Sequence, residues 1–391
     1  MNRLPIVVIA DDLTGAAEIA AIGHLRGLST AIVLDTTMGL PLATGLLVID
    51  SNTRLDTPEL AASKMRAIAE LIPRRLRGRI FKKVDSVLRG QVAAELEVLC
   101  DALDHTSALL CPCNPSRGRC IIRGRYTIDG VPLDQTPFAT DPQHPACSNR
   151  VELLLGRTRL PVHVHDAEGV QLAALTRGLH IGSAQNVTEV NAWASRLRDG
   201  VLPAGGADFF GAFLDLLGKP GPTSPEGCDI AGPHLLLSGS LAPAGAAFRN
   251  ALMDTGTSVV RLPVLAYDPA ALEQAVARLA ASLARDGKAV AATSDTPCTD
   301  AEGTAWLQTC FSKTTSLLHA RRCFSHLLAE GGSTAALAAA ALGWTSLTVA
   351  GVWAGGVVTL RPDLDAHVLF TMKPGSYPWP DSLRAMLSRS S

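Results

Sequence analysis

Charged and polar side chains follow four apolar segments in the first half of the chain. The four segments are Asp11-Asp12, Asp50-Ser51-Asn52-Thr53-Arg54, Lys82-Lys83-Val84-Asp85-Ser86 and Asn114-Pro115-Ser116-Arg117-Gly118-Arg119. Carboxylates accept hydrogen bonds from hydroxyl groups, and Arg54, Arg117 or a lysine can pair with a ligand carboxylate. The set therefore suits a small, polyhydroxylated anion. A structural alternative stays open, since Asp12 could simply cap a helix and Lys82-Lys83 could be a solvated strand end.

The second half contains glycine turns of a kind that suits phosphate binding. Glycine lets the backbone approach a ligand closely, and free amide groups at a helix start attract phosphate oxygens. The turns are Ser238-Gly239-Ser240, Gly331-Gly332-Ser333-Thr334 and Lys373-Pro374-Gly375-Ser376, the last of which adds a cation. Neither a Walker loop nor a Gly-x-Gly-x-x-Gly fingerprint occurs. Such turns can also be mere helix caps, but together with the polar first half they indicate phosphoryl transfer.

These residues need a sheet that brings the ends of its strands together. Short apolar runs alternate with helical patterns in the first half, which predicts right-handed βαβ crossovers and a mostly parallel sheet. The expected strands cover residues 6–10, 30–34, 46–49, 79–84 and 107–111, and a helix capped by Thr57 starts at Pro58. Ligands of such sheets bind beyond the carboxyl ends of the strands. Residues 112–145 show no period, and we expect a long functional loop there.

The same alternation returns in the second half, after a stretch rich in proline and glycine at residues 218–232 that is the best candidate for a linker. We therefore predict an α/β protein made of two α/β domains, residues 1–225 and 226–391, with mostly parallel sheets and an interdomain cleft. A length of 391 residues agrees with two domains.

Composition excludes several classes of partner. Lys and Arg total 35 against 36 Asp and Glu, so no basic excess exists to bind nucleic acid. Nine cysteines without a Cys-x-x-Cys pair favour free thiols in a reducing cytoplasm over a zinc site or a disulfide framework. The N-terminal apolar run is too short for a signal peptide. Residues 331–360 lack charge, but their glycines indicate a buried helix–strand unit rather than a membrane span.

Several motifs resemble those of the four-carbon acid sugar kinases. In the first half these are Ile9-Ala10-Asp11-Asp12-Leu13-Thr14-Gly15-Ala16 and Lys82-Lys83-Val84-Asp85-Ser86-Val87-Leu88-Arg89-Gly90, followed by Asp129-Gly130-Val131-Pro132-Leu133 and Phe138-Ala139-Thr140-Asp141-Pro142. In the second half they are Ser238-Gly239-Ser240, Gly331-Gly332-Ser333-Thr334-Ala335 and Lys373-Pro374-Gly375. The resemblance spans nearly the whole chain in the family's order.

The resemblance implies a kinase that moves a phosphoryl group from ATP, with Mg²⁺, to the terminal hydroxyl of a four-carbon sugar acid. The N-terminal domain would bind the sugar acid and the C-terminal domain the nucleotide. The implied acid site comprises Asp11, Asp12, Arg54, Lys82, Lys83, Val84, Asp85 and Arg117, with Asp12 or Asp85 as the catalytic carboxylate. The implied ATP site comprises Ser238, Ser240, Gly331, Gly332, Ser333, Thr334, Lys373 and Gly375. We assign no metal ligands.

Two further points follow from the resemblance. D-Threonate or D-erythronate is the preferred substrate, 3-oxo-tetronate is the alternative, and a homodimer is the expected assembly of this cytoplasmic protein.

A different class of function also stays open. Leu241 and Pro378 alter two of the family's turns, so the chain could be a catalytically weak sugar-acid sensor that kept the fold. A dehydrogenase is disfavoured because the dinucleotide fingerprint is missing.

Overall fold

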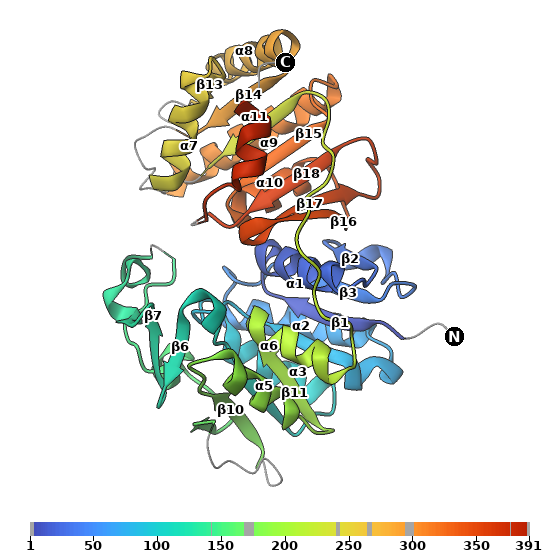
Figure 1. Ribbon diagram of the computed structural model, residues 1–391, viewed down its shortest axis with the longest axis vertical. Coiled ribbons are helices and arrows are strands. Elements are labelled where there is room, and N and C mark those ends of the chain that lie inside the picture. The colour runs from blue at the N-terminus through green and yellow to red at the C-terminus, as the bar shows by residue number, and fades with distance from the viewer. Residues whose placement is uncertain are drawn as a thin grey trace. The chain divides into compact units, whose positions relative to one another are not determined.

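The computed structural model divides into two compact units, residues 1–223 and 224–391. It describes residues 4–141, 143–167, 176–239, 243–263, 268–293, 301–375 and 377–388. Figure 1 shows the first unit in blue to green and the second in yellow to red, each with strands covered by helices. The division falls within the proline- and glycine-rich stretch, two residues before the expected boundary. The predicted α/β class with mostly parallel sheets is confirmed.

The first unit is built on eight parallel strands in the order β2-β3-β1-β4-β11-β5-β10-β9. The strands are β1 (Ile6–Ala10), β2 (Thr30–Val33), β3 (Leu46–Asp50), β4 (Ile80–Lys83), β5 (Ser107–Cys111), β9 (Val162–His165), β10 (Gly178–Gly182) and β11 (Val201–Gly205). Most of the central strands are buried along their whole length, as expected when helices cover both faces. The sheet therefore places the carboxyl ends of β3, β1 and β4 side by side.

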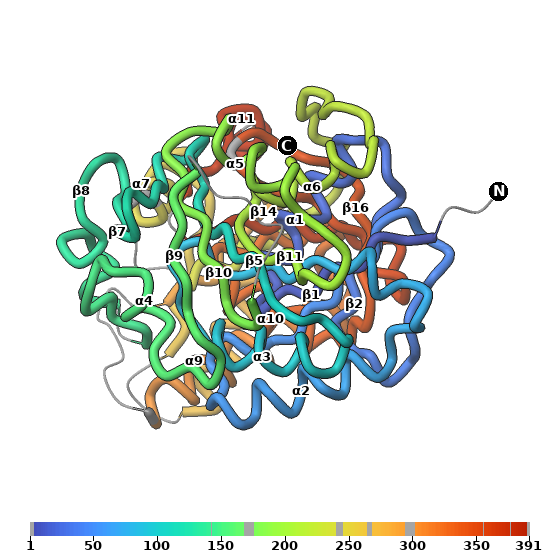
Figure 2. The backbone as a smooth tube through the Cα atoms, turned by 90° about the horizontal axis from the view of Figure 1, so that it is seen from below, coloured from blue at the N-terminus to red at the C-terminus, as the bar shows by residue number. Residues whose placement is uncertain are grey.

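Helices cover both faces of this sheet. Figure 2 shows α2 and α3 on one side of the strands and α5 and α6 on the other, and α1 packs with α6. The helices are α1 (Leu13–Leu25), α2 (Pro58–Leu71), α3 (Val92–Ala102), α4 (Val151–Leu154), α5 (Val187–Ser195) and α6 (Ala207–Leu216). Thr57 caps α2 by accepting a hydrogen bond from the Leu60 amide, with Pro58 in the first turn. This N-cap prediction is confirmed.

The segment expected to be a long irregular loop contains a small antiparallel sheet. Its strands are β6 (Arg119–Ile122), β7 (Arg125–Ile128) and β8 (Val131–Pro132). Two-residue turns join them, Arg123-Gly124 and Asp129-Gly130, and all four turn residues have positive φ angles. That geometry matches the twist of a tight hairpin. The expectation of one long loop was therefore wrong for residues 119–132, which form these strands and turns.

The second unit contains a mixed sheet in the order β13-β14-β12-β15-β18-β17-β16. The strands are β12 (His234–Ser238), β13 (Ser258–Arg261), β14 (Lys288–Ala292), β15 (His326–Glu330), β16 (Ser346–Trp353), β17 (Val357–Pro362) and β18 (Leu369–Lys373). Strands β13, β14, β12, β15 and β18 are parallel, whereas β17 pairs antiparallel with both β18 and β16. The ends of β12, β15 and β18 that precede the glycine turns thus lie along one edge.

Five helices accompany this sheet: α7 (Pro243–Asp254), α8 (Pro269–Asp286), α9 (Ala301–Ala320), α10 (Gly332–Ala341) and α11 (Asp381–Ser388). One core cluster joins Phe248 and Leu252 of α7 to Trp379 and to Leu383 of α11. Helices α8, α9 and α10 pack in series, with α8 on β14 and α10 on β15. Residues 331–360 form α10 and strand structure, as expected from their lack of charge. No described helix has both the length and the apolar character needed to cross a bilayer.

Candidate functional site

The polar segments of the first half meet at one edge of the parallel sheet. Ala10 is in register with Asp50 on one side and with Lys83 on the other, so the residues that follow β1, β3 and β4 are neighbours. Asp12 caps α1 with one carboxylate oxygen, which accepts the Gly15 amide at 2.7 Å. Its other oxygen pairs with Arg54. The capping alternative and the charged-site expectation thus both apply to Asp12.

Arg54 is the centre of a carboxylate cluster. Its Nε and Nη2 atoms contact the two oxygens of Asp11 at 2.7 and 2.9 Å, and its Nη1 atom contacts Asp12 and lies 3.7 Å from Asp85. Only 15% of the side chain is exposed. Burial lowers the pKa of Arg54, but Asp11 and Asp12 outweigh it and raise that pKa further above its usual value. Arg54 therefore orients three carboxylates, rather than presenting a free guanidinium to a ligand as the sequence had suggested.

The two adjacent lysines of β4 point in opposite directions, as strand geometry requires. Lys82 is completely buried and its Nζ lies 2.9 Å from Oε2 of Glu95 in α3. Lys83 donates to the Val84 carbonyl at 2.8 Å and lies 3.4 Å from Glu18 in α1. The predicted substrate contact from Lys82 does not match this geometry, because its ammonium group is inaccessible to solvent and is paired with Glu95. Val84 is also buried.

Asp85 forms a second cluster of charged side chains with Arg89. Arg89 donates to both carboxylate oxygens of Asp85, through Nε at 3.0 Å and Nη2 at 2.9 Å, and its Nη1 donates to Asp141 at 3.1 Å. Burial raises the pKa of Asp85, but Arg89 and Arg54 outweigh burial and hold that pKa below its usual range. Leu88 adopts a φ of 63°, a strained value for a residue with a side chain, within the same turn. A carboxylate held this firmly in its charged form is a poor proton acceptor.

The β6–β7 hairpin adds a cation that the sequence reasoning did not select. Arg119 contacts the Ser86 hydroxyl through Nη1, and the Tyr126 hydroxyl donates to the Ser86 carbonyl at 2.6 Å. The guanidinium groups of Arg89 and Arg119 lie 5.3 and 5.8 Å from the centre of the Phe138 ring. Arg117, the residue chosen from the sequence, is exposed at the end of a short 3-10 helix. Arg119 is therefore the arginine of this loop that the structure joins to the Asp85 segment.

The proton affinities of the carboxylates differ across the site. Burial raises the pKa of Asp12 and nearby Asp11 adds to the rise, against the opposing effect of Arg54. Burial, with a further contribution from Asp12, raises the pKa of Asp50 to about 7. Burial also raises that of Asp11, but Arg54 and Lys82 reverse the shift. Asp12 is the most exposed of the three carboxylates around Arg54, at 20% of its side chain against 3% for Asp11 and 7% for Asp85.

The second unit gathers another polar group where β12, β15 and β18 end. Ser238 donates to Oε2 of Glu330 and accepts from Nη1 of Arg249 at 2.7 Å. Lys373 Nζ lies 2.9 Å from Oε1 of Glu330, and both side chains are only 1% exposed. Burial lowers the pKa of Lys373 although Glu330 opposes the shift. Lys373 also donates to the carbonyls of Pro374 and Gly375 at 3.2 and 3.3 Å. These hydrogen bonds stabilise the Lys373-Pro374-Gly375 turn.

The start of α10 has the geometry of an anion site. Gly331 adopts a φ of 97°, and no side chain caps the helix that begins at Gly332. The amide of Gly331 is bonded to the Lys373 carbonyl at 3.1 Å, which ties this turn to the Lys373-Pro374-Gly375 turn. Ser333 is exposed and Thr334 is half-buried within the first helical turn. Three of the predicted turns thus involve adjacent strand ends, although Ser240 lies outside the described residues.

Residues 6–198 match the family model of a sugar-binding N-terminal domain. The chain is 30% identical over 165 residues to the D-threonate kinase of Salmonella typhimurium, which covers 41% of this chain and 38% of that protein. It is 32% identical over 145 residues to the D-erythronate kinase of Heliobacterium modesticaldum, covering 36% and 33%. Residues 6–198 thus belong to this family of sugar-binding domains, in agreement with the resemblance that the motifs carried. In these two comparisons the match spans less than two fifths of the relative's length.

Longer matches extend the similarity into the second unit. The 3-oxo-tetronate kinase of Pseudomonas fluorescens is 27% identical over 312 residues, covering 73% of this chain and 71% of that protein. Among solved structures, the Haemophilus influenzae protein HI1011 superimposes with a TM-score of 0.71 at 20% identity, with 98% of each chain covered. A Salmonella typhimurium structure reaches a TM-score of 0.79 at 21% identity over 98% of each chain. These two structures share the fold of this chain over nearly its whole length.

Several residues of the charged clusters were not selected from the sequence. They are Asp50, Arg89, Glu95, Arg119, Asp141, Arg249 and Glu330. Four of them nevertheless lie in segments that the sequence analysis singled out: Asp50 and Arg119 in the polar segments, and Arg89 and Asp141 in the family motifs. Glu95 and Glu330 are carboxylates opposite buried lysines, and a buried ammonium group requires such a partner. The partners' positions depend on packing between distant segments.

Asp50 provides a test of these electrostatics through the pH dependence of stability. Its pKa is raised in the folded protein. Between about pH 4 and 7 the folded state therefore still holds a proton that the unfolded chain has already released. The stability of the wild type relative to Asp50→Asn should therefore fall by about 1.4 kcal/mol per pH unit across this window and level off above pH 8. Urea unfolding of both proteins at pH 5, 6, 7 and 8 measures the difference.

The control for this experiment is Asp35→Asn, at a half-buried aspartate whose pKa the Thr37 amide lowers. A lowered pKa affects stability only as the pH falls towards about 4, so this variant should run parallel to the wild type from pH 5 to 8. A flat difference for Asp50→Asn over the same range would contradict the raised pKa.

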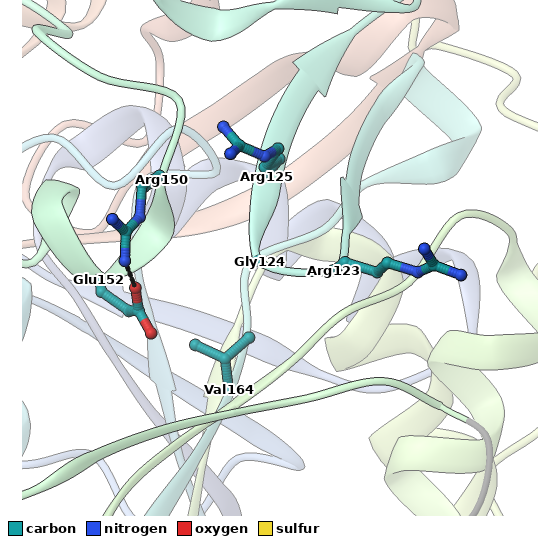
Figure 3. Close-up of a pocket in the computed structure, with 6 residues that line it drawn as sticks. All are labelled: Arg123, Gly124, Arg125, Arg150, Glu152 and Val164. Atoms are coloured by element: carbon teal, nitrogen blue, oxygen red, sulfur yellow. Dashed lines mark hydrogen bonds and ion pairs between the residues drawn. The ribbon is translucent and has the colours of Figure 1, made fainter.

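A separate cavity of about 270 Å³ lies at the tip of the β6–β7 hairpin, away from the strand ends. Its lining residues are Arg123, Gly124, Arg125, Arg150, Glu152 and Val164. Figure 3 shows Arg123 and Arg125 pointing away from each other and Arg150 bonded to Glu152. Since the arginines do not converge on one point, this cavity lacks the geometry of an anion site.

Proposed function

We propose that the chain is an ATP-dependent kinase that phosphorylates the terminal hydroxyl of a four-carbon sugar acid. The observation that carries this proposal is the clustering of Asp12, Asp50, Asp85, Arg89 and Arg119 at the strand ends of a sugar-binding family domain. Relatives over this part of the chain are named D-threonate and D-erythronate kinase, and a longer match is named 3-oxo-tetronate kinase. The substrates and the activity of those relatives are carried over here as a proposal.

In this proposal the aspartates at the strand ends bind the hydroxyl groups of the acid. Arg89 and Arg119 bind its carboxylate. The Arg89 side chain is 29% exposed, against 15% for Arg54 and none for Lys82. Arg119 is half-buried and therefore also more accessible than Lys82. Asp12 orients and deprotonates the attacking hydroxyl, because it combines a raised pKa with the greatest exposure around Arg54. Asp85, Arg54 and Lys82 act as positioning residues.

The second unit holds the phosphate groups of ATP in this proposal. The uncapped start of α10 supplies amide groups and a favourable helix dipole for phosphate oxygens. ATP reaches kinases with Mg²⁺, which is usually bound by phosphates and waters with one or two carboxylates. Among the described residues at these strand ends, Glu330 is a buried carboxylate already engaged by Ser238 and Lys373. No described residue at these strand ends is therefore assigned as a ligand of Mg²⁺.

A coupled assay of ADP release tests the proposed activity. We expect turnover above the ATPase background with D-threonate or D-erythronate, and weaker turnover with 3-oxo-tetronate, since a site that bonds a hydroxyl rejects an analogue lacking it. Product analysis should show phosphate on the terminal oxygen. Absence of turnover with every acid would overturn the kinase proposal. If calorimetry then detected acid binding without Mg-ATP binding, the chain would be a sugar-acid sensor.

The nucleotide half has its own test in Gly331→Ala. A side chain at a φ of 97° is strained by roughly 1–2 kcal/mol, so the turn should relax away from its phosphate-binding shape. We expect Mg-ATP affinity to fall about tenfold, measured by calorimetry without acid. Acid binding should not change.

Gly78→Ala is the matched control, since an added Cβ there also meets no atom within 4 Å but the backbone does not adopt a positive φ. It should keep wild-type affinity for both ligands. Unchanged Mg-ATP affinity in Gly331→Ala would remove α10 from the proposed nucleotide site.

We also propose that the protein works in the cytoplasm. Eight cysteines of the described residues are free, and several of them are buried. Free thiols are the usual state of cysteine in a reducing compartment.

A further inference from the structure

Two histidines and one aspartate of the second unit present their side chains to one another. His319 lies in the last turn of α9, whereas Asp365 and His367 lie between β17 and β18. Nε2 of His319 is 2.6 Å from Oδ2 of Asp365, and Nε2 of His367 is 3.1 Å from Oδ1 of the same carboxylate. The three potential ligand atoms all lie within 4.8 Å of one another. Nothing in the proposed kinase chemistry uses this cluster.

We propose that His319, Asp365 and His367 form a binding site for a divalent transition-metal ion of the Zn²⁺ type. Zinc binds imidazole nitrogen and carboxylate oxygen at about 2.0–2.2 Å, so tetrahedral ligands are roughly 3.3 Å apart. The 3.1 Å distance from His367 to Oδ1 of Asp365 is close to that spacing. The 2.6 Å contact of His319 is made to the other carboxylate oxygen, and it would lengthen as an ion replaces the hydrogen bond. Three protein ligands leave one position for water. The two nitrogen ligands favour Zn²⁺, Co²⁺, Ni²⁺ or Cu²⁺ over Mg²⁺ and Ca²⁺, which prefer oxygen.

The surroundings hold the ligands in place before an ion arrives. The Asp365 side chain is only 7% exposed, and its carbonyl accepts the Val368 amide at 3.0 Å. Arg361 donates to the Ala366 carbonyl at 2.6 Å, which fixes the backbone between the aspartate and His367. The His319 ring lies 5.9 Å from that of Phe324. His367 is 68% exposed, so the site is open to solvent on that side.

The cluster lies at the opposite end of the strands from the proposed phosphate site. Asp365 and His367 precede β18, and the chain reaches Lys373 only at the far end of that strand. A metal here would join the end of α9 to the β17–β18 turn, two segments that are 46 residues apart in sequence. Its expected effect is therefore on the stability of the second unit and not on nucleotide binding.

Cobalt provides the direct test because its spectrum reports the ligands. The full chain, made without a histidine tag and freed of metal by chelation, should bind one Co²⁺ with visible d–d bands typical of four or five ligands. It should lack the near-ultraviolet bands of thiolate ligands. Zn²⁺ should displace the cobalt and raise the Tm, whereas Mg²⁺ should do neither. Absence of a cobalt spectrum would mean that the three side chains form only a hydrogen-bonded cluster, and would overturn the proposal.

Variants locate the ion. His367→Ala removes an exposed ligand and should fold normally, and Asp365→Asn keeps the shape of the side chain. Each should weaken cobalt binding about tenfold or more and abolish the Zn²⁺-induced rise in Tm. His24→Ala, at a half-buried histidine of the first unit, should bind as the wild type does. Equal affinity in the wild type and both ligand variants, or thiolate bands in the spectrum, would place the metal elsewhere and overturn the proposal.

Discussion

Asp12→Asn is expected to lower kcat by about 10²–10⁴-fold while leaving the protein folded. The substitution removes the group that we propose takes the proton of the attacking hydroxyl. It retains an oxygen that can accept the Gly15 amide, and asparagine is as good an N-cap residue as aspartate. Because the helix start is preserved, loss of activity should not be accompanied by loss of the structure. Steady-state kinetics with the preferred tetronate and far-ultraviolet circular dichroism measure the two properties.

The control for capping is Asp268→Asn, at the aspartate that caps α8 by accepting the amides of Ala270 and Ala271. It should change neither kcat nor KM. If Asp12→Asn kept more than about a tenth of wild-type kcat, Asp12 would not be the general base.

Asp85→Asn separates the two carboxylates between which the sequence could not choose. Asp85 is held in its charged form by Arg89 and Arg54, so its replacement leaves two half-buried cations with one partner fewer. We expect its dominant effect to be on stability and on KM, because Arg89, one of the two arginines proposed to bind the acid, loses its anchor. A loss of kcat alone, with stability and KM unchanged, would instead identify Asp85 as the base.

The sequence predicted the sheet and the edge at which charged side chains gather, because both depend on local pattern. An apolar run followed by charged residues, as at Asp11 and Asp50, predicts a buried parallel strand whose end faces solvent or a ligand. The hairpin turns also carried a local signal. Asp129-Gly130 is a typical two-residue hairpin turn, and Arg123-Gly124 adopts the same kind of geometry. The lack of period between residues 112 and 145 concealed this signal, since strands of two to four residues are too short to show one.

The pairing of the charged side chains depends on packing between segments that are distant in the chain. Lys82 and Lys83 are identical in type and adjacent, and strand alternation shows only that they point to opposite faces. That Lys82 meets Glu95 follows from the way α3 packs beneath the β4 end. The choice between Arg117 and Arg119 likewise depended on the hairpin, which brings Arg119 to Ser86. Residue types at a strand end thus indicate the class of ligand, but the fold decides which side chains reach it.

The buried pair of Lys82 and Glu95 should be costly to break. Lys82→Met leaves the Glu95 carboxylate enclosed without a cation, and removing one partner of a buried pair costs roughly 3–5 kcal/mol. The free energy of unfolding from urea denaturation measures this loss. Thr53 is hydrogen-bonded to Glu95 and its hydroxyl lies 2.9 Å from that of Ser51. Because this turn carries Arg54, we also expect a smaller decrease in kcat.

The double variant Lys82→Met with Glu95→Gln removes the orphaned charge and keeps an oxygen for the Thr53 hydroxyl. It should recover more than half of the lost stability, since two buried charges are replaced together. Lys64→Met is the matched control at the partly exposed pair with Asp56, whose 2.8 Å contact should contribute no more than about 1 kcal/mol. If Lys82→Met cost no more than Lys64→Met and instead raised only the KM for the acid, Lys82 would contact the substrate directly. The enclosure of its ammonium group predicts the reverse, a large loss of stability with a modest change in KM.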